Sequence, residues 1–379
     1  MKKISSVLSI VFFFSTLVIL AVATIVSDKQ SFSETENRTL AELPSASANS
    51  VLNKSYMNGI ENYLSDYFPM RDKWVTAMTS LEQIMGHKQV GGVLLLEDRM
   101  VAEFNNIDDS TVNTSINAIN TFSQQHDIPM YVMIAPTAIG VYTDELPANY
   151  TTIDQKYLID QIYVNLNSKI TTLNAYSALY STRDEYTYFR TDHHWTPLGA
   201  FYAYSETIGK MGYEAVPFSN YNIEHVSDSF YGTLYSEAPN YKYRSDSIDV
   251  FNVKKGSTVT EVIQSVNGKD EKFDSMYFYD ELDKKNKYQF YLGNSTTPIT
   301  TIKTDCENDA KLLVVKDSYA QCLVPFYTQH YSEITILDLR TTGPFGIDAL
   351  VDVSEYDQML IVYNLANFTE DANIEKLGL

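Results

Sequence analysis

Cysteine is scarce in this sequence. The 379 residues include only two cysteines, Cys306 and Cys322. They cannot form a cysteine-based zinc pattern, and they are not the dense disulfide framework of a small secreted domain. One disulfide and two free thiols both remain open, and the apolar stretch around Cys322 favours buried free thiols.

Positive charge is also scarce. Lys and Arg number 28 against 48 Asp and Glu, so the formal net charge is -20 and the pI is near 4.6. Affinity for nucleic acids comes largely from Lys and Arg that displace counterions from phosphates. The charge therefore argues against nucleic acid as a partner and indicates a soluble, acidic surface.

The sequence has no internal repeat and no recognisable nucleotide-binding or coenzyme A-binding fold, so no cofactor is expected. Apolar residues are plentiful instead. Hydrophobic residues make up 44% of the chain and charged residues 20%, which is enough to bury a large core. A chain of this length accommodates one large α/β domain, or a domain with a substantial insertion.

The N-terminus predicts the location of the protein. Residues 4–26 carry no charge, and about 20 such residues form a helix that crosses a hydrocarbon core. Lys2 and Lys3 stay cytoplasmic, which places the rest of the chain outside. A cleaved signal peptide is the alternative, because Ala21-Val22-Ala23 resembles a cleavage site. We expect a membrane anchor over residues 1–27, since the apolar run continues past that site.

After the anchor, the polar residues 28–55 predict a linker, and residues 56–379 an extracytoplasmic domain. Apolar residues at helical spacing over 56–85 predict two helices or one helix broken at Pro69. Residues 91–104 predict a hairpin.

Further along, apolar strands alternate with helices. The predicted strands are residues 130–136, 311–316, 333–339 and 358–364, and the predicted helices are residues 111–126, 152–170, 197–211 and 319–331. This alternation predicts an α/β fold, a doubly wound parallel sheet with its functional loops at the carboxyl ends of the strands. Residues 213–305 break the rhythm and predict a β-containing insertion near the site. Their many tyrosines suit sugar stacking, but tyrosine is also a common strand residue.

The segment TDHHWT, residues 191–196, predicts chemistry. In an extended segment Asp192 and His194 share a face, so the carboxylate can orient the imidazole as a base. One alternative is a polar cap before the helix at 197, with Thr196 as its N-cap. A metal site made of Asp192, His193 and His194 is the other, although no remote third ligand can be named.

The segment KDSY, residues 316–319, follows a predicted buried strand and begins a helix. Ser318 is therefore expected on a sharp turn at the carboxyl edge of the sheet, beside helix amides. Such amides stabilise an oxyanion by about 10²- to 10³-fold per donor. Asp317 or Ser318 could also simply cap the helix. The Asp–His motif elsewhere in the chain favours a nucleophilic serine.

These motifs resemble those of the DHHW protein family, which is related to the SGNH-like O-acetyltransferases and acetylesterases of bacterial exopolysaccharide export, those of alginate acetylation among them. Similar blocks occur at residues 63–74, 230–236, 322–340 and 360–368. The resemblance thus covers nearly the whole predicted ectodomain. It implies an SGNH-hydrolase-like fold in which an Asp-x-His motif precedes the serine.

The resemblance maps a catalytic triad onto Asp192, His194 and Ser318. One departure is Lys316, which stands where SGNH enzymes commonly have glycine before Asp-Ser. The oxyanion and substrate-binding candidates are Tyr319, Gly293, Asn294, His193 and Trp195. No metal is expected.

The expected function is that of an extracytoplasmic O-acetyltransferase that acts on a cell-wall or secreted polysaccharide through an acyl-serine. Carbohydrate acetylesterase activity with the same triad is one alternative, and a non-catalytic glycan-binding or scaffold protein of an envelope assembly is another. The resemblance also implies a membrane-bound O-acyltransferase partner that supplies acetyl groups.

Overall fold

The computed structural model describes residues 2–26, 32–33, 38–266, 268–294 and 297–379. The chain forms two compact units. Residues 1–91 together with 235–242 make the smaller one, and residues 92–234 together with 243–379 make the larger one. The larger unit begins at Gly92, and the single extracytoplasmic domain over residues 56–379 stays a prediction.

In its described residues, the smaller unit contains helices and three very short strands. They are α1 (Lys2–Val26), β1 (Phe32–Ser33), β2 (Arg38–Thr39), α2 (Ala48–Leu52), α3 (Ser55–Asp66), α4 (Arg71–Ile84) and β3 (Gln89–Val90). The predicted break at Pro69 is confirmed, because α3 ends at Asp66 and α4 begins at Arg71. Met70, between them, has a left-handed backbone with φ of 59°, which no α-helix continues through.

The structure does not support the predicted anchor, and it describes only part of the predicted linker. Within the described part of the chain, no helix is both long enough and apolar enough to cross a membrane. The expected anchor over residues 1–27 therefore has no support from the structure. Of the expected linker, residues 28–31 and 34–37 lie outside the described residues. The rest is not simply extended, since it contains α2 and the pairing of β1 with β2.

The larger unit is built on an eight-stranded sheet with the order β11-β10-β12-β14-β13-β15-β6-β7. Its strands are β6 (Met130–Ala135), β7 (Ile170–Thr172), β10 (Val259–Val266), β11 (Lys269–Phe273), β12 (Ile299–Thr304), β13 (Lys311–Lys316), β14 (Glu333–Leu337) and β15 (Gln358–Asn364). The four predicted strands are all present, as β6, β13, β14 and β15. They pair in parallel because the helices between them return the chain to the same end of the sheet.

Only part of this sheet is parallel, which corrects the predicted architecture. β12 pairs antiparallel with β14, and β10 with both β12 and β11. These three strands belong to the predicted insertion, residues 213–305, so much of that segment completes the main sheet. Burial alternates along β10, as is typical of an antiparallel strand with one exposed face.

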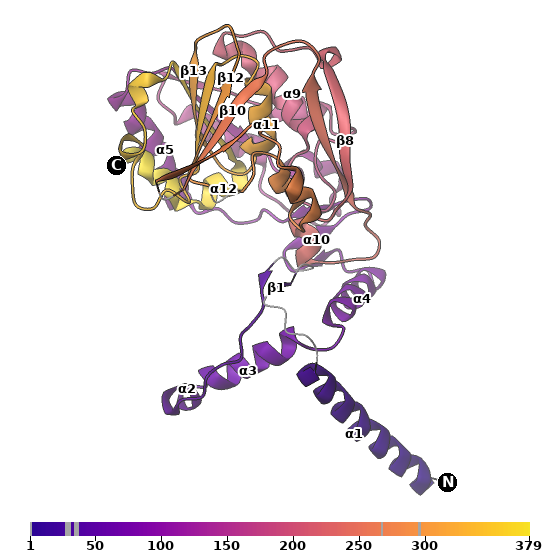
Figure 1. The fold of residues 1–379 in the computed structure, drawn as a ribbon. Coiled ribbons are helices and arrows are strands. Elements are labelled where there is room, and N and C mark those ends of the chain that lie inside the picture. The colour runs from indigo at the N-terminus through magenta and orange to yellow at the C-terminus, as the bar shows by residue number, and fades with distance from the viewer. Residues whose placement is uncertain (1, 27–31, 34–37, 267, 295–296) are drawn as a thin grey trace. The chain divides into compact units, whose positions relative to one another are not determined.

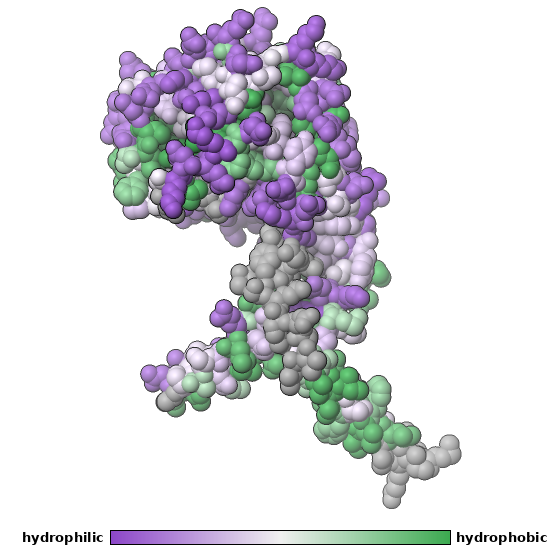
Figure 2. All heavy atoms as spheres, viewed as in Figure 1, coloured by the Kyte–Doolittle hydropathy of each residue, from purple (hydrophilic) through white to green (hydrophobic). Residues whose placement is uncertain are grey.

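Helices cover both faces of the sheet (Figure 1), with α5 packed on α12 and α9 packed on α11. The helices are α5 (Asp109–Gln125), α6 (Ala138–Val141), α7 (Gln155–Val164), α8 (Tyr176–Ser181), α9 (Pro197–Thr207), α11 (Ala320–Tyr327) and α12 (Leu365–Glu370), and α10 (Thr233–Glu237) spans both units. Buried residues of β6, β13, β14 and β15 form the centre of the core. Figure 2 shows hydrophilic side chains spread over the visible face of this unit, in keeping with the net charge.

Two smaller strand pairs complete the larger unit. β4 (Val93–Leu95) and β5 (Met100–Ala102) form the predicted hairpin. β8 (Tyr221–Phe230) pairs antiparallel with β9 (Asp246–Val253). The chain that leaves β8 and the first residue of β9 both contact the segment TDHHWT, so this strand pair helps to position the site.

Candidate active site

Ser318 lies on the turn between β13 and α11. β13 is buried along almost its whole length, and the Asp317 amide still donates to the Val362 carbonyl of β15 at 3.0 Å. The chain then leaves the sheet, and α11 starts at Ala320. Ser318 is partly exposed although its neighbours Asp317 and Tyr319 are fully buried. The turn therefore presents the hydroxyl at the carboxyl edge of the parallel strands, as the sequence predicted.

Four N–H donors hold the Asp317 carboxylate beneath this turn. One oxygen, Oδ2, accepts from the Asn364 amide at 2.8 Å, from Asn364 Nδ2 at 2.6 Å and from Asn367 Nδ2 at 3.0 Å. The other accepts from the Tyr319 amide at 2.8 Å. Burial raises the pKa of Asp317, and these hydrogen bonds partly oppose the rise. The contacts fix the backbone on either side of Ser318.

The segment TDHHWT folds back onto residues 187–189 as a tight loop. The Thr196 amide donates to the Thr187 carbonyl at 2.9 Å, and the Phe189 amide to the His194 carbonyl at 3.2 Å. Thr196 is also the N-cap of α9, because its hydroxyl accepts from the Gly199 amide. The capping interpretation thus holds for Thr196 alone.

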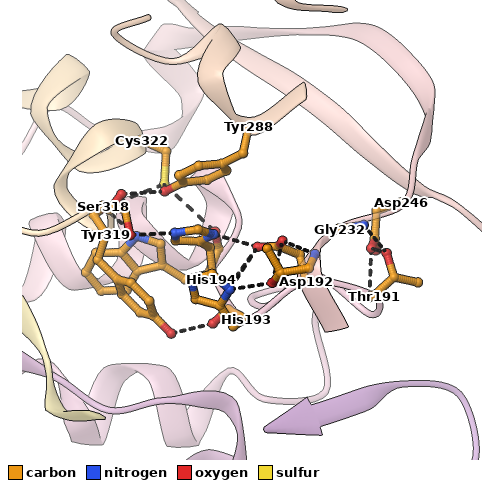
Figure 3. A network of polar contacts seen from close by, with 12 residues as sticks. Thr191, Asp192, His193, His194, Gly232, Asp246, Tyr288, Ser318, Tyr319 and Cys322 are labelled. Atoms are coloured by element: carbon orange, nitrogen blue, oxygen red, sulfur yellow. Dashed lines mark hydrogen bonds and ion pairs between the residues drawn. The ribbon is translucent and has the colours of Figure 1, made fainter. Parts of the chain in front are cut away.

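The three predicted triad residues bring together the histidine loop, residues 191–196, and the serine turn, residues 316–319 (Figure 3). His194 Nε2 lies 2.7 Å from Ser318 Oγ, and His194 Nδ1 lies 2.5 Å from Asp192 Oδ1. Asp192 and His194 are buried, with 2% and 5% of their surfaces exposed. A carboxylate, an imidazole and a hydroxyl in this order can move the hydroxyl proton to the imidazole and stabilise the resulting cation.

The second oxygen of Asp192 contacts the turn that follows β8. The Thr233 amide donates to Asp192 Oδ2 at 2.9 Å and the Thr233 hydroxyl at 3.3 Å. Burial disfavours the Asp192 anion, but the neighbouring His194 and His193 and these hydrogen bonds outweigh it and hold the pKa of Asp192 well below its usual range. Gly232 allows the close approach, since a Cβ there would lie 2.2 Å from Asp192 Cβ. Asp192 is therefore held ionised and in one position.

Aromatic rings flank the His194 imidazole on two sides. Tyr288 stacks on it with ring centroids 3.8 Å apart and an interplanar angle of 10°. His193 also lies 3.8 Å away, at 37°. The Tyr288 hydroxyl donates to the Ser318 carbonyl at 3.0 Å. Tyr288 thus contacts both the His194 imidazole and the turn that carries Ser318, and limits how the imidazole can rotate.

Asp192, His193 and His194 also have the composition of a metal site, with ligand atoms within 4.8 Å of one another. Their donors are engaged in other ways. His194 bonds to Asp192 through Nδ1 and to Ser318 through Nε2, and His193 Nδ1 lies 2.6 Å from the Thr233 hydroxyl. Three of the four ring nitrogens therefore serve a hydrogen-bond network, and the donor set fits acid–base chemistry better than a metal ion.

Two of the remaining candidates occupy structural positions. The Tyr319 amide, expected in an oxyanion hole, donates to Asp317 instead. Trp195, expected to bind substrate, is fully buried, so it has no surface for a ligand. Its indole Nε1 donates to the Tyr319 carbonyl at 2.9 Å, and the Tyr319 hydroxyl donates to the His193 carbonyl at 2.6 Å. Both side chains lock the histidine loop to the serine turn.

The remaining candidates, His193, Asn294 and Gly293, lie nearer the surface or beside exposed residues. His193 exposes 36% of its side chain beside the triad. Asn294 is exposed, and the neighbouring Gly293 carbonyl accepts from Gln321 Nε2 at 3.2 Å. Lys316 is buried and bonds to Asp338 at 3.1 Å, which explains how a lysine is tolerated before Asp-Ser. Cys322 is buried and Cys306 partly buried, and both are free thiols.

Sequence reasoning missed several residues that contact the site. Tyr288, Thr233 and Asp246 lie in the segment taken as an insertion, where tyrosines and polar residues gave no local signal. Asn364 offered a signal, because an asparagine at the last position of a buried parallel strand lies at the carboxyl edge of the sheet. Which residues lie beside Asn364 at that edge depends on the order of the strands in the sheet. The local sequence pattern does not specify that order.

Comparisons with known proteins agree with this architecture. A DHHW family protein from Eubacterium siraeum has a TM-score of 0.65 at 24% identity, covering 76% of this chain and 95% of that one. PatB1 of Bacillus cereus, in a structure with a sulfonyl adduct, has a TM-score of 0.63 at 19% identity, covering 74% and 97%. The O-acetyltransferase domain of Pseudomonas putida AlgJ reaches only 0.46 at 14% identity, covering 76% and 98%.

At their identities, the similarity to the Eubacterium siraeum protein and to PatB1 demonstrates a shared fold. No curated protein matches the chain. The model of the DHHW protein family matches residues 85–337, about two thirds of the sequence, including both the histidine loop and the serine turn. The chain therefore belongs to the DHHW protein family.

Proposed function

We propose that this protein is a serine-dependent O-acetyltransferase that acts on a cell-wall or secreted polysaccharide. The observation that carries the proposal is the continuous contact from Asp192 through His194 to Ser318, with the serine partly exposed and the other two side chains buried. A hydroxyl bonded to an oriented imidazole is an activated nucleophile for acyl transfer.

In the proposed first half-reaction, Ser318 Oγ attacks the carbonyl carbon of an acetyl ester while His194 Nε2 takes the hydroxyl proton. The carbon–oxygen bond to the leaving group breaks, and His194 returns the proton to the departing oxygen. In the second half, a sugar hydroxyl gives its proton to His194 and attacks the acetyl-serine, and Ser318 Oγ recovers that proton as it leaves. General base catalysis typically contributes about 10²- to 10⁴-fold.

The developing oxyanion needs N–H donors, and the Ser318 amide is our first candidate. In the described part of the chain it has no backbone acceptor, whereas the amides of Asp317 and Tyr319 are both engaged. Asn294 is the proposed second donor. Support for it comes from Gln321, the second residue of α11, which donates to the carbonyls of Tyr291 and Gly293. Asn294→Ala should then lower kcat about 10²- to 10³-fold.

The site of action and the acetyl supply are part of the proposal. The uncharged residues 4–26 favour a domain that works outside the cytoplasm, whether they remain or are cleaved. An acetyl donor must then reach the outer face, which favours a membrane-bound O-acyltransferase partner. Protease accessibility of the tagged C-terminus in intact cells tests the location, and co-purification with such a partner tests the supply.

Transfer and hydrolysis are distinguished by one assay. Purified protein is incubated with an activated acetyl ester, with and without a soluble oligosaccharide. O-acetylated sugar is the expected product, and its absence together with free acetate would instead identify an acetylesterase. A scaffold without activity would release no acetate above Ser318→Ala, and a metalloenzyme would lose its activity to chelators.

The nucleophile can be tested separately. PatB1 carries a sulfonyl adduct in its structure, so we expect an aryl sulfonyl fluoride to label this protein. Peptide mass spectrometry should place the adduct on Ser318, with fluoride released and the hydroxyl proton passed to His194. Ser318→Ala should abolish labelling and His194→Ala should slow it at least about 10²-fold. Labelling at another residue, or labelling unaffected by His194→Ala, would overturn the proposed mechanism.

A further inference from the structure

A second buried carboxylate, Asp246, lies behind the histidine loop. It is the first residue of β9 and exposes 1% of its surface. Oδ1 accepts from the Tyr186 hydroxyl at 2.6 Å and from the Arg190 amide at 2.7 Å. Oδ2 accepts from the Thr191 amide at 2.8 Å and from the Thr191 hydroxyl at 2.5 Å. All four donors lie in the six residues that precede Asp192.

Two consecutive amides after β8 bond the neighbouring residues Thr191 and Asp192 of this loop. The Gly232 amide donates to Thr191 Oγ1 at 3.2 Å, and the next amide along, that of Thr233, donates to Asp192 Oδ2. Figure 3 shows Asp246 and Thr191 on one side of this turn and Asp192 with His194 on the other. A shift of the Thr191 backbone would therefore displace the triad carboxylate directly.

The ionised carboxylate suits this position because it accepts hydrogen bonds and donates none. Each oxygen receives two donors, so an amide in its place would set an NH₂ group against two of them in either orientation. Burial raises the pKa of Asp246, and the hydrogen bonds from Thr191 and Tyr186 oppose the rise. An uncompensated buried anion is costly, which is consistent with four donors converging on it.

We propose that Asp246 is a positioning residue for the reaction. Through its hydrogen bonds to Thr191, it fixes the position of the Asp192 and His194 side chains relative to Ser318. This inference rests on the proposed function for its chemistry. Asp246 contacts no reacting atom and acts only through the loop. Misplacement of a catalytic group by about 1 Å can cost about 10²-fold in rate, so the effect should fall on kcat and leave substrate affinity nearly intact.

The test compares Asp246→Asn with the unchanged protein by ester turnover and by the rate at which a sulfonyl fluoride labels Ser318. Rates are divided by the final labelled fraction, so that misfolded molecules are not counted. We expect kcat and the labelling rate to fall together by about 10- to 100-fold, with KM within about twofold. In a His194→Ala background, Asp246→Asn should slow labelling no further, because it acts through the histidine.

Milder variants keep the test decisive if Asp246→Asn does not fold. Thr191→Val keeps the shape but removes one donor to Asp246 together with the acceptor of the Gly232 amide. Tyr186→Phe removes another donor to Asp246 and leaves the contact with Gly232 in place. Each should lower kcat about threefold to tenfold, and together they should approach the effect of Asp246→Asn. Asp305→Asn is the matched control, since Asp305 also accepts from the amide and hydroxyl of one threonine, Thr258, away from the site. It should leave kcat unchanged.

The outcomes separate the two proposals. If Asp246→Asn or Thr191→Val lowers the melting temperature while the normalised kcat and labelling rate stay at their original values, the positioning role is refuted. An additional loss in the His194→Ala background refutes it as well. Failure of the unchanged protein to label at Ser318 overturns the proposed nucleophile instead. Labelling without acetyl transfer to sugar overturns only the transferase, and the role of Asp246 is still read from the labelling rate.

Discussion

The residue that stacks face to face on the proposed base is Tyr288, which had no recognisable role in the sequence. Its ring face lies against His194 and its hydroxyl reaches the Ser318 carbonyl. An aromatic face attracts a cation, so it favours the imidazolium that forms during proton transfer. The ring and the hydroxyl therefore make separable contributions.

Substitutions at Tyr288 should distinguish these contributions. Tyr288→Phe keeps the stacked ring and should lower kcat only about threefold, the loss of one modest hydrogen bond. Tyr288→Leu removes the aromatic face and should lower kcat about 10-fold or more, with little change in KM. Steady-state ester kinetics measure both. Equal effects of the two variants would contradict a role for the ring.

Gly232 is a second residue at which a substitution should have a specific effect on the triad. A Cβ at this position would lie 2.2 Å from both Asp192 Cβ and Asp192 Oδ2. Gly232→Ala should therefore displace the triad carboxylate, lower kcat at least about 10²-fold and cost about 1–3 kcal/mol of stability through overpacking. Gly209→Ala is the matched control, because an added Cβ there meets nothing within 4 Å. Ester kinetics and thermal unfolding of both variants give the answer.

At the scale of elements, an ionic cluster around the buried Asp338 joins the ends of β13 and β14. Asp338 is fully buried and bonds to Lys316 at 3.1 Å and to Arg340 at 2.6 Å. Burial opposes ionisation of Asp338, but these two cations outweigh it and lower its pKa. The lysine that departs from the SGNH pattern is therefore part of the strand packing below the serine turn.

Removal of the shared anion should be costly. Asp338→Ala leaves the buried Lys316 ammonium without its counter-ion and should lower the free energy of unfolding by about 3–5 kcal/mol. Urea denaturation at neutral pH measures the loss. Lys272→Ala, which breaks the exposed pair with Glu261, should leave the free energy of unfolding nearly unchanged. Similar losses for both variants would show that burial is not what gives the cluster its importance.

At the scale of the whole molecule, His330 links acidity to stability. It is buried, and the Tyr204 hydroxyl, which accepts from the Val216 amide, donates to His330 Nε2 at 2.6 Å. Burial lowers the pKa of His330 to about 4, from the ordinary 6.5. The unfolded chain therefore binds a proton that the folded protein excludes, and stability is lost as the pH falls from 6.5 towards 4.

His330→Gln should reduce this acid sensitivity, because glutamine accepts the Tyr204 hydrogen bond and does not titrate. Between about pH 7 and about pH 5, the original protein should lose about 1–2 kcal/mol more than the variant. Urea denaturation at both pH values provides the comparison. An equal loss in the two proteins would place the acid sensitivity in other groups.

Much of the fold followed from local patterns. Uninterrupted apolar segments identified β6, β13, β14 and β15, and helical spacing with Pro69 identified α3 and α4, because burial and backbone geometry leave a periodic record in the chain. The antiparallel strands β10, β11 and β12 were mistaken for an insertion. Strand partners are chosen by long-range packing, which has no signature within a short window.

The site divides in the same way. The sequence by itself singled out the candidates for the chemistry, since Asp192, His194 and Ser318 stand in unusual polar motifs that core packing does not produce. Only the tertiary structure decided that they meet, that Tyr288 stacks on the imidazole and that Asp246 supports the loop from behind. The physical reason is that residue chemistry belongs to each side chain, whereas a distance of a few ångströms depends on how the sheet, the loop and the β8–β9 pair fold together.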